Sequence, residues 1–479
     1  MDSKNILLFG AGKSASVLID YLIEESTINN WKITIADANK SLIDQKTGNH
    51  PQVISVGLDI TNHEIRQSLI ASSDIVISMM PPALHYLIAD DCVQQKKSLL
   101  TASYADENIK NLHEKVLENG NIFLCEMGLD PGIDHMSAME ILDSIKLKGG
   151  KIISFKSHCG GLVAPESDNN PWRYKISWNP RNVVTAGKLG AIYKNDGEIV
   201  NEDYSSLFNN QRKVTIDGDE FCFYPNRNSL PYIDIYNLKS AKTFIRTTLR
   251  YSDFMYGWNN LIELGFTDET VQYQTDGMSL QEFFKLHLSK YGFELWLDKK
   301  LSEKFSAANT IIETLIDENG NIKEAEFLQQ NESITKKIEL NMHEANITLN
   351  QLLYLGMEDN STIINLGLCS AADVLQLMLE KKLLLQPEDK DMIVMLHEIE
   401  YELNNTIHQI NSSLMVKGDD NIHTAMAKTV GLPLGIAAKL ILNGTIRQKG
   451  VLIPVEKEIY TPVLNELKKY GISFKENHF

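Results

Sequence analysis

The sequence of 479 residues has few cysteines, and their spacing is not that of a disulfide framework or a metal site. Its five cysteines are scattered, odd in number and free of any CxxC spacing. A disulfide framework and a cysteine-based zinc site are therefore not expected, and no other metal site is predicted. Reduced thiols in a cytoplasmic protein are the expectation.

Long apolar runs and positive charge are also scarce. No stretch approaches the roughly 18 consecutive apolar residues of a membrane-spanning helix, and the N-terminus lacks the basic-then-apolar pattern of a secretory leader. The 46 lysine and arginine residues are outnumbered by 63 aspartate and glutamate residues, so the net charge is −17. A nucleic-acid partner, which requires a basic face, and a membrane partner are not expected.

A strand, a tight glycine turn and a helix stand near the start of the chain. The apolar run 5–9 is followed by Gly10-Ala11-Gly12-Lys13-Ser14-Ala15 and then by a helical pattern. This G-x-G-x-x-A spacing is a variant of the dinucleotide-binding fingerprint, in which Gly10 permits the turn and Gly12 lets the backbone approach a pyrophosphate. A tight turn with no ligand can have the same glycines, so the following strand carries part of the argument.

That following strand, 32–36, ends at Asp37. An acid at this position accepts hydrogen bonds from the ribose hydroxyls and repels a 2′-phosphate. The nearest basic residue after the strand is Lys40, which could still turn toward a phosphate. The sequence therefore favours NAD over NADP.

Apolar runs continue to alternate with helical patterns up to about residue 126. This alternation predicts a parallel, Rossmann-like sheet whose ligands lie at the carboxyl ends of the strands. Ser103, Tyr104 and Asp130 each follow such an end. The segment 128–178 is dense in functional residue types: acids sit on a turn around Asp130, and a polar loop follows the double glycine next to Cys159. Such loops commonly carry function.

The middle of the chain has a different pattern. Strand-like runs at 151–157, 213–224 and 242–251, and a hairpin at 392–416, predict a second, mixed sheet of the α+β kind. Leu-, Glu- and Lys-rich helical spacing between about 259 and 390, for example at 307–317, predicts an all-helical insertion. Two helices, 424–430 and 434–443, are expected on either side of a break at Gly431-Leu432-Pro433. The chain is therefore expected to change character after Asp130 and to contain an insertion at 259–390.

Several long motifs carry a resemblance to a known family. GLDPGIDH at 128–135 and the segment 159–178 resemble matching segments of the saccharopine reductases, also called glutamate-forming saccharopine dehydrogenases. Four further segments share this resemblance: YPNR at 224–227, TLRY at 248–251, KDMIVM at 390–395 and AMAKTVGLP at 425–433. The similarity covers nearly the whole chain and is weakest between about 267 and 386.

The resemblance implies an enzyme of lysine metabolism. Such an enzyme passes hydride from saccharopine to NAD or NADP, and water then splits the imine into L-glutamate and L-2-aminoadipate 6-semialdehyde. The resemblance implies contacts to saccharopine at these positions: Ser103, Tyr104, Asp130, Arg227, Thr247, Thr248 and Leu249. It implies contacts to the dinucleotide at these positions: Gly10, Ala11, Gly12, Lys13, Asp37, Asp59, Ile77, Leu129, Pro131 and Ser177.

Arginine is suited to bidentate capture of carboxylates, so Arg250 joins Arg227 as a substrate-binding candidate. The proton-transfer group is left open among Asp130, Tyr104 and Cys159. Asp130 is a base or holds the substrate ammonium, whereas Tyr104 would need its pKa lowered by a nearby cation, and a buried Cys159 would be inert. His158 replaces a tyrosine that the family often has, which matters only if it faces the cleft.

Two alternatives remain open. One is a related imine-forming dehydrogenase on the same scaffold, of the carboxynorspermidine or lysine 6-dehydrogenase type. The other is a nucleotide sensor that has lost turnover, which Asp130, Arg227 and Arg250 argue against. The resemblance also implies that the C-terminal tail packs back on the dinucleotide domain, which is therefore discontinuous. The division is then 1–130 with 434–479 for the dinucleotide, 131–258 with 391–433 for substrate and dimerisation, and 259–390 as the insertion. A homodimer built on the second sheet is expected from the resemblance.

Overall fold

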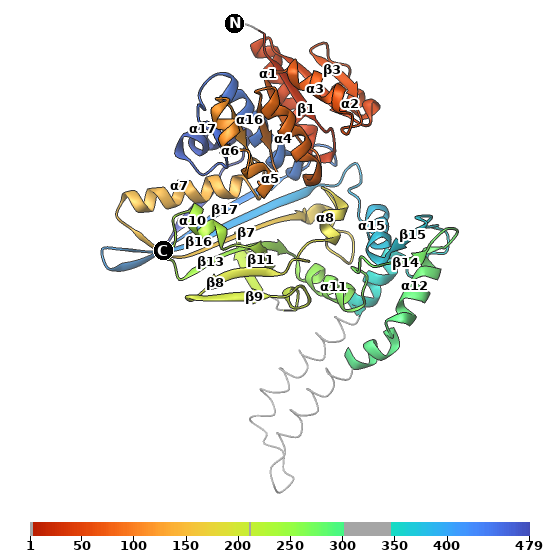
Figure 1. Ribbon diagram of the computed structural model, residues 1–479. Helices are drawn as coiled ribbons and strands as arrows, with labels where there is room; N and C mark the ends of the chain where they lie inside the picture. Colours follow the sequence, from red (N-terminus) through yellow and green to blue (C-terminus); the bar gives the residue numbers. More distant parts are fainter. Residues whose placement is uncertain (1–2, 210–211, 301–345) are drawn as a thin grey trace.

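The computed structural model describes residues 3–209, 212–300 and 346–479, and two large sheets organise them (Figure 1). The first sheet has seven strands in the order β18-β6-β5-β4-β1-β2-β3. The strands of this sheet are β1 (Asn5–Phe9), β2 (Lys32–Asp37), β3 (Val53–Gly57), β4 (Ile75–Ser78), β5 (Ser98–Thr101), β6 (Ile122–Leu124) and β18 (Gly450–Leu452). All neighbouring pairs are parallel, as the alternating pattern predicts.

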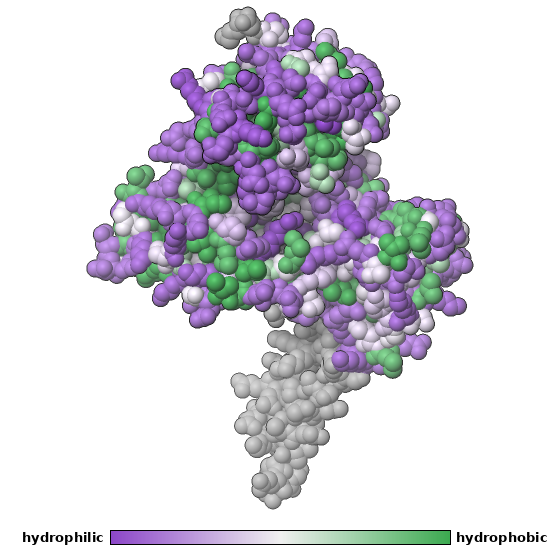
Figure 2. All heavy atoms as spheres, viewed as in Figure 1, coloured by the Kyte–Doolittle hydropathy of each residue, from purple (hydrophilic) through white to green (hydrophobic). Residues whose placement is uncertain are grey.

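Helices cover both faces of this sheet, which explains why its central strands are nearly continuous apolar runs. The helices around it are α1 (Ser16–Asn29), α2 (Lys40–Thr47), α3 (His63–Ala71), α4 (His85–Gln94), α5 (Glu107–Lys110), α6 (His113–Glu118), α16 (Ala425–Leu442) and α17 (Lys457–Leu467). Asn39 and Asn62 begin α2 and α3, because each side chain accepts a backbone N–H of the first turn. Polar side chains cover most of the visible face of this part of the molecule (Figure 2).

The second sheet is mixed and has ten strands. Its main path runs β10-β11-β13-β7-β16-β17-β19; β8 pairs with β13 beside this path, and β9 and β12 pair with β8. The strands are β7 (Lys151–Val163), β8 (Ala191–Asn195), β9 (Glu198–Glu202), β10 (Arg212–Ile216), β11 (Asp219–Pro225), β12 (Arg227–Asn228), β13 (Thr243–Arg250), β16 (Asp391–Leu403), β17 (Thr406–Lys417) and β19 (Lys475–His478). The β16–β17 hairpin turns at Asn404 and Asn405, both with positive φ, as the sequence predicts.

Helix α7 (Ile133–Leu147) follows the first sheet and packs on β7 and β16 (Figure 1). The largest apolar cluster is continuous from the first sheet through α7 and α16 to β7 and β16. The two sheets therefore share one core, and the groups at their junction have fixed positions. The short helices of the second part are α8 (Pro180–Val184), α9 (Tyr204–Leu207) and α10 (Pro231–Ile235).

The segment between about 259 and 390 contains the expected helices, and also a feature that the sequence did not predict. Its described elements include the end of α11 (Ser252–Glu263), α12 (Leu280–Lys290) and α15 (Ala371–Lys382). Ser279 and Ser370 begin α12 and α15 with capping boxes. A short two-stranded sheet, β14 (Val271–Gln274) and β15 (Leu368–Ser370), joins these helices, so helix is not the only structure here. The predicted helix at 307–317 lies outside the described residues.

The expected break at residues 431–433 is wrong, because α16 is one helix from Ala425 to Leu442 with Pro433 inside it. The glycines serve close packing instead: a Cβ on Gly431 would lie 2.9 Å from the Leu18 backbone nitrogen, and one on Gly435 would lie 2.4 Å from the Tyr21 ring. By length and composition α16 is the one described helix that could cross a membrane, but 67% of it is buried inside the protein. It is a core helix here.

Part of the C-terminal tail returns to the first sheet. β18 pairs with β6, and α16 packs against α1. The last strand, β19, was not expected and pairs with β17 of the second sheet. The run 213–224 is likewise two strands, β10 and β11, joined by a tight turn.

Candidate active site

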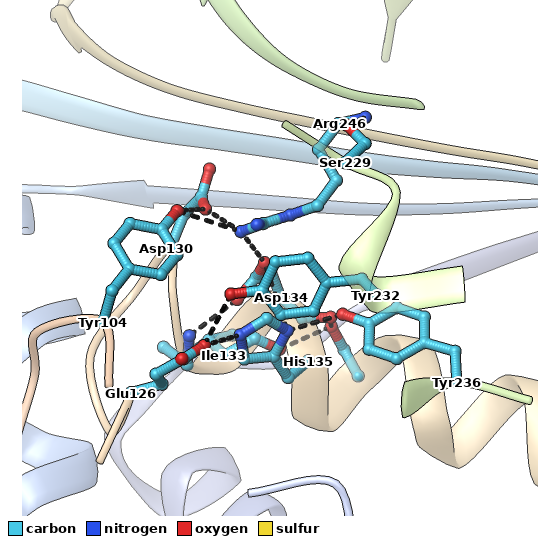
Figure 3. Close-up of polar contacts among 12 residues, drawn as sticks. Tyr104, Glu126, Asp130, Ile133, Asp134, His135, Ser229, Tyr232, Tyr236 and Arg246 are labelled. Carbon is cyan, nitrogen blue, oxygen red and sulfur yellow. Dashed lines mark hydrogen bonds and ion pairs between the residues drawn. The ribbon is translucent and has the colours of Figure 1, made fainter. Parts of the chain in front are cut away.

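The two sheets bring three functional side chains together at their junction (Figure 3). Tyr104 follows β5, Asp130 lies between β6 and α7, and Arg246 points from β13 toward both. Arg246 Nη2 donates to Asp130 Oδ1 at 2.5 Å and to the Tyr104 hydroxyl at 3.3 Å. The Tyr104 hydroxyl in turn donates to Asp130 Oδ1 at 3.4 Å.

Arg246 was missed by the sequence analysis, which chose Arg227 and Arg250. Arg246 is a charged residue inside the mostly buried strand β13, whose sequence is TFIRTTLR. Its guanidinium also donates to Asp134 Oδ2 at 2.8 Å and lies over the Tyr232 ring at 4.5 Å. A charge that breaks a run of strand-forming residues was the available signal, since buried charges require partners.

Burial dominates the electrostatics of the junction. It raises the pKa of Asp130, against the lowering effect of Arg246. Burial also raises the pKa of Tyr104 well above its ordinary value, although Arg246 acts in the opposite direction. The condition under which Tyr104 would be a base, a lowered pKa, is therefore not met, because the desolvation of its phenolate outweighs the nearby cation.

A second layer of polar groups lies behind Asp130 and Arg246 (Figure 3). Asp134 accepts from the Gly132 N–H at 2.6 Å, and His135 lies between Glu126 and Tyr236 at 2.8 and 2.5 Å. Burial alone would raise the pKa of Asp134, but His135, Arg246 and the Gly132 N–H together lower it. His135 therefore does more than orient the start of α7, because it touches a carboxylate from another segment.

Ser103 is tied to the neighbouring strand by a buried histidine. Its hydroxyl lies 2.8 Å from His85 Nε2, and His85 Nδ1 lies 2.8 Å from the Ser78 hydroxyl at the end of β4. Burial lowers the pKa of His85 to about 4, so the ring is neutral near pH 7. From its helical pattern His85 is expected to be a surface or packing residue, since nothing in that pattern shows that the first residue of α4 meets two strand ends.

Of the two arginines chosen from sequence, the structure brings one to the junction. Arg227 is exposed in β12 with a φ of 53°, and its guanidinium carbon lies 5.4 Å from the centre of the Tyr104 ring. Arg250 is buried and donates to the Leu249 carbonyl at 2.8 Å, over the rings of Tyr174 and Phe254. Among the described residues, Arg250 Nε has no hydrogen-bond partner.

Strand β13 divides its predicted contact residues between two faces of the sheet. Arg246 faces the junction, and Thr248, two residues along, shares that face. The Thr247 hydroxyl bonds instead to His158 Nδ1 at 2.7 Å, and Leu249 packs in the cluster on the other face. His158 is buried and its Nε2 lies 2.9 Å from Glu398. His158 therefore faces away from the cleft.

Cys159 lies in β7 with its side chain in the shared core. Burial raises the pKa of its thiol well above the ordinary value, with Asp130 and Asp134 adding to the effect. A neutral, buried thiol is a poor nucleophile or base. A catalytic role for Cys159 receives no support from this environment.

The glycine turn has the shape that a dinucleotide requires. Gly10 has a φ of 96°, and a Cβ there would lie 3.0 Å from the Met79 carbonyl oxygen, so a side chain would be strained. A Cβ on Gly12 would meet none of the described atoms within 4 Å, which leaves open space above the turn. Lys13 begins the 3₁₀ turn that leads into α1. These residues fit the pyrophosphate of a dinucleotide.

Asp37 and Lys46 fix this turn from two sides. Asp37 Oδ2 accepts the Ala11 N–H at 2.8 Å, and Oδ1 accepts the Asn39 N–H at 2.9 Å. Lys46 of α2, which the sequence analysis did not single out, donates to the Gly12 carbonyl at 2.7 Å and to the Ser16 hydroxyl at 2.8 Å. Burial lowers the pKa of Lys46 to about 8, although Asp20 and Asp37 act in the opposite direction.

The other predicted dinucleotide contacts differ in their surroundings. Asp59 follows β3 and accepts from Thr61, whereas Leu129 and Pro131 flank Asp130. The Ile77 side chain is fully buried in the core, because it lies inside β4 rather than at its end. The contact expected at Ile77 stays a prediction, and the buried side chain leaves the backbone of β4 as the part that could make it. Ser177 bonds to Asp391, whose carboxylate accepts two N–H groups at the start of α16.

Two family models match the chain. Residues 6–124 match the saccharopine dehydrogenase NADP binding domain, and residues 128–472 match the saccharopine dehydrogenase C-terminal domain. The boundary between them falls at the end of β6, just before Asp130. The candidate site thus lies where the two matched regions meet.

Relatives match along nearly the whole chain. Saccharopine dehydrogenase [NADP(+), L-glutamate-forming] of Saccharomyces cerevisiae is 32% identical over 479 residues, 99% of either chain. Alpha-aminoadipic semialdehyde synthase of Arabidopsis thaliana is 33% identical over 98% of this chain but 44% of its own length. The chain thus spans about half the length of the semialdehyde synthases that it matches.

A solved structure agrees in fold. The histidine-tagged saccharopine dehydrogenase (L-Glu forming) from Saccharomyces cerevisiae superposes with a TM-score of 0.81, covering 100% of both chains at 29% identity. The Rossmann-like sheet, the mixed sheet and the connecting core are therefore a known arrangement. Together with the two family models, this agreement shows that the chain belongs to the saccharopine dehydrogenase family.

Proposed function

We propose that the chain oxidises the CH–NH group of saccharopine. Saccharopine, an oxidised nicotinamide dinucleotide and water give L-glutamate, L-2-aminoadipate 6-semialdehyde, the reduced dinucleotide and one proton. The observation that carries this proposal is the cluster of Asp130, Arg246 and Tyr104 between the two sheets. A protonated amine that enters there meets the ionised Asp130, and Arg246 and Tyr104 hold that carboxylate in one orientation.

The cofactor, when bound, supplies the hydride acceptor. Gly10 and Gly12 allow its pyrophosphate to approach the backbone, and Asp37 presents its carboxylate to the ribose. Ser103, held by His85 at the ends of neighbouring strands, lies at the carboxyl edge where such ligands bind. The remaining predicted contacts, Lys13, Asp59, Leu129, Pro131 and Ser177, surround this edge in the proposal.

We propose NAD as the preferred form. Asp37 repels a 2′-phosphate, Lys40 pairs with Asp44 at 2.8 Å, and Lys46 is used by the glycine turn. The matched domain model and the yeast relative carry NADP in their descriptions, so the proposal depends on the charge around Asp37. The ratio of kcat/KM for the two dinucleotides tests it directly.

The substrate carboxylates need cations, and the exposed Arg227 is the first candidate. It projects beside Tyr104, where a planar, bidentate contact to a carboxylate would also exclude water from the Tyr104 ring. Arg250 is the second candidate, because its buried Nε has no partner among the described residues. The side chain of Thr248 and the backbone of β13 at Thr247 and Leu249 line the same region.

For proton transfer we propose Asp130 rather than Tyr104 or Cys159. Arg246 and Tyr104 both bond to its Oδ1, which leaves Oδ2 to take the proton that the amine loses. Tyr104 and Cys159 both keep their protons, since burial raises the pKa of each. Water delivers the oxygen atom of the semialdehyde.

We further propose the division 1–130 with 434–479, 131–258 with 391–433, and 259–390, with a homodimer built on the second sheet. The 433/434 boundary lies inside α16, and β19 belongs to the second sheet, so residues 434–479 serve both parts. All five cysteines are buried and unpaired, which supports a reducing compartment such as the cytoplasm. Light scattering on the purified protein tests the dimer.

The deciding experiment mixes the purified protein with saccharopine and either NAD or NADP at alkaline pH and follows the absorbance of the reduced nicotinamide. An increase in this absorbance with NAD supports both the reaction and the interpretation of Asp37. Appearance with NADP only keeps the reaction and overturns the cofactor preference. No appearance with either, in protein that binds the cofactor, overturns the substrate and directs the test to lysine and carboxylated polyamines.

A further inference from the structure

His135 is completely buried between two carboxylates that come from different segments. Its Nε2 lies 2.8 Å from Glu126 Oε2, and its Nδ1 lies 3.6 Å from Asp134 Oδ2 and 2.5 Å from the Tyr236 hydroxyl. Its ring stacks on Tyr232, with 5.1 Å between ring centres. Every polar atom of the imidazole therefore has a partner, and none of these partners is solvent-exposed.

The charges around this ring do not balance without it. Glu126, Asp130 and Asp134 supply three carboxylates, and Arg246 supplies one guanidinium. Glu126, Asp134 and Arg246 are each at most 4% exposed, so water compensates little of this charge. Buried carboxylates are stable only when they are paired. A second buried cation would leave a single negative charge, on the carboxylate that faces the site.

The oxygen atoms of Glu126 support this arrangement. Oε2 accepts from the Tyr232 hydroxyl at 2.9 Å and lies next to His135, while Oε1 accepts the Ala105 N–H at 3.2 Å. Both oxygens of Glu126 therefore have hydrogen-bond partners besides the ring. Glu126 on one side and Asp134, whose pKa is lowered in part by His135 itself, on the other place a carboxylate near each ring nitrogen.

A second buried histidine packs against the same helix and provides the contrast. His397 of β16 has its Nε2 2.8 Å from the Ser137 hydroxyl, and its Nδ1 has no partner among the described residues. Burial lowers the pKa of His397 to about 4, against the attraction of Asp134. Two histidines that meet the same helix thus have different surroundings: a hydroxyl alone for His397, and two carboxylates beside a hydroxyl for His135.

We propose that His135 is held as an imidazolium and is a positioning residue for Asp130. It does not touch substrate. Instead it neutralises Glu126 and Asp134, so that Arg246 remains available to Asp130 and Asp130 stays ionised to receive a protonated amine. The titratable and charged groups that face His135 are Glu126 from the loop after β6, Asp130 from the loop before α7, Asp134 on α7, Tyr232 on α10, Tyr236 just after α10, Arg246 on β13 and His397 on β16.

The protonation state is tested without turnover. Protein labelled with ¹⁵N-histidine, with the His135 signals assigned by their loss in His135→Gln, should show both His135 ring nitrogens at the shift of protonated nitrogens near pH 7. His397 should show one protonated and one bare nitrogen in the same spectrum. A bare nitrogen on His135 would overturn the proposal.

The positioning role rests on the proposed function and is tested by pH profiles. A cation near Asp130 lowers the pKa of that carboxyl, so its loss in His135→Gln should raise the pKa. The acid limb of kcat/KM should then move to higher pH by about one unit. His397→Gln removes a neutral ring of the same size and should leave the limb in place.

Equal acid limbs in His135→Gln and the unchanged protein would overturn the positioning role. If His135→Gln does not fold, His135→Asn and the NMR spectrum of the unchanged protein still decide the charge. If the unchanged protein does not oxidise saccharopine but shows the doubly protonated ring, the proposed substrate fails and the charge assignment stands. The two failures are therefore distinguishable.

Discussion

The glycine turn and the Asp130–Arg246 cluster are built in opposite ways. The turn is local and open: Gly12 faces free space, and Asp37 holds the loop through backbone N–H groups. The cluster is assembled from the segment after β5, the β6–α7 loop and β13, with Arg246 buried and Asp130 half-buried. A local, open site should lose affinity when a residue changes, whereas a buried cluster should also lose stability.

The largest effect is expected from Arg246→Met. Removing the guanidinium leaves Asp130 and Asp134 buried without their cation, which should cost about 3–5 kcal/mol in the free energy of unfolding and abolish turnover. Urea denaturation measures the first and the dinucleotide assay the second. Lys213→Met, which breaks an exposed ion pair with Glu220, is the control and should cost less than about 1 kcal/mol. Equal losses of unfolding free energy in Arg246→Met and Lys213→Met would contradict the contrast between buried and exposed charge.

Arg227→Ala should separate binding from stability. Because Arg227 is exposed, the free energy of unfolding should change by less than about 0.5 kcal/mol. Loss of a charge pair with the substrate should weaken saccharopine binding by about 2–5 kcal/mol while dinucleotide binding persists. Titration calorimetry with each ligand measures both. A nucleotide sensor with no amine substrate would show no such difference.

Changing Asp37 should alter cofactor choice without disturbing the cluster. Asp37→Ala combined with Asn39→Arg removes a negative charge and adds a positive one beside the ribose. The NADP-to-NAD ratio of kcat/KM should therefore rise at least tenfold, which corresponds to ~1.4 kcal/mol. KM for saccharopine should stay the same. An unchanged ratio would remove the argument for NAD that rests on Asp37.

Lys46→Met should weaken dinucleotide binding by about 1 kcal/mol, because the Gly12 carbonyl loses a charged donor. In the unchanged protein, affinity should also fall as the pH rises through about 8, where Lys46 loses its proton. Lys46→Arg should keep its affinity at that pH. Lys40→Met on the same helix is the control, since Lys40 pairs with Asp44 at the surface. Fluorescence titration with the reduced dinucleotide measures all four proteins.

The smallest effect is expected from Cys159→Ala. Burial keeps the thiol protonated, so kcat and its pH profile should be nearly unchanged, and the small cavity should cost about 1 kcal/mol in stability. Stopped-flow kinetics and urea denaturation measure these. If the alkaline limb of the kcat pH profile disappears in Cys159→Ala, the thiolate takes part in the reaction.

Much of the fold could be predicted from local pattern. Parallel strands with helices between them, the β16–β17 hairpin with its two asparagines and the return of the tail to the first sheet all follow from periodicity, turn residues or the family resemblance. The break in α16 was predicted wrongly because Gly431 and Pro433 are residues that usually end helices. Here the glycines allow α1 to approach, a reason that lies in another helix.

The sequence by itself determined the glycine turn, Asp37, the polar groups after the strand ends and the family, because these depend on residues close together in the chain. Only the tertiary structure decided that Arg246 is the cation at Asp130, that His135 bridges Glu126 and Asp134, and that Cys159 and Tyr104 keep their protons. The physical reason is burial: the charge and protonation of a side chain depend on partners brought from distant segments and on the water that they exclude.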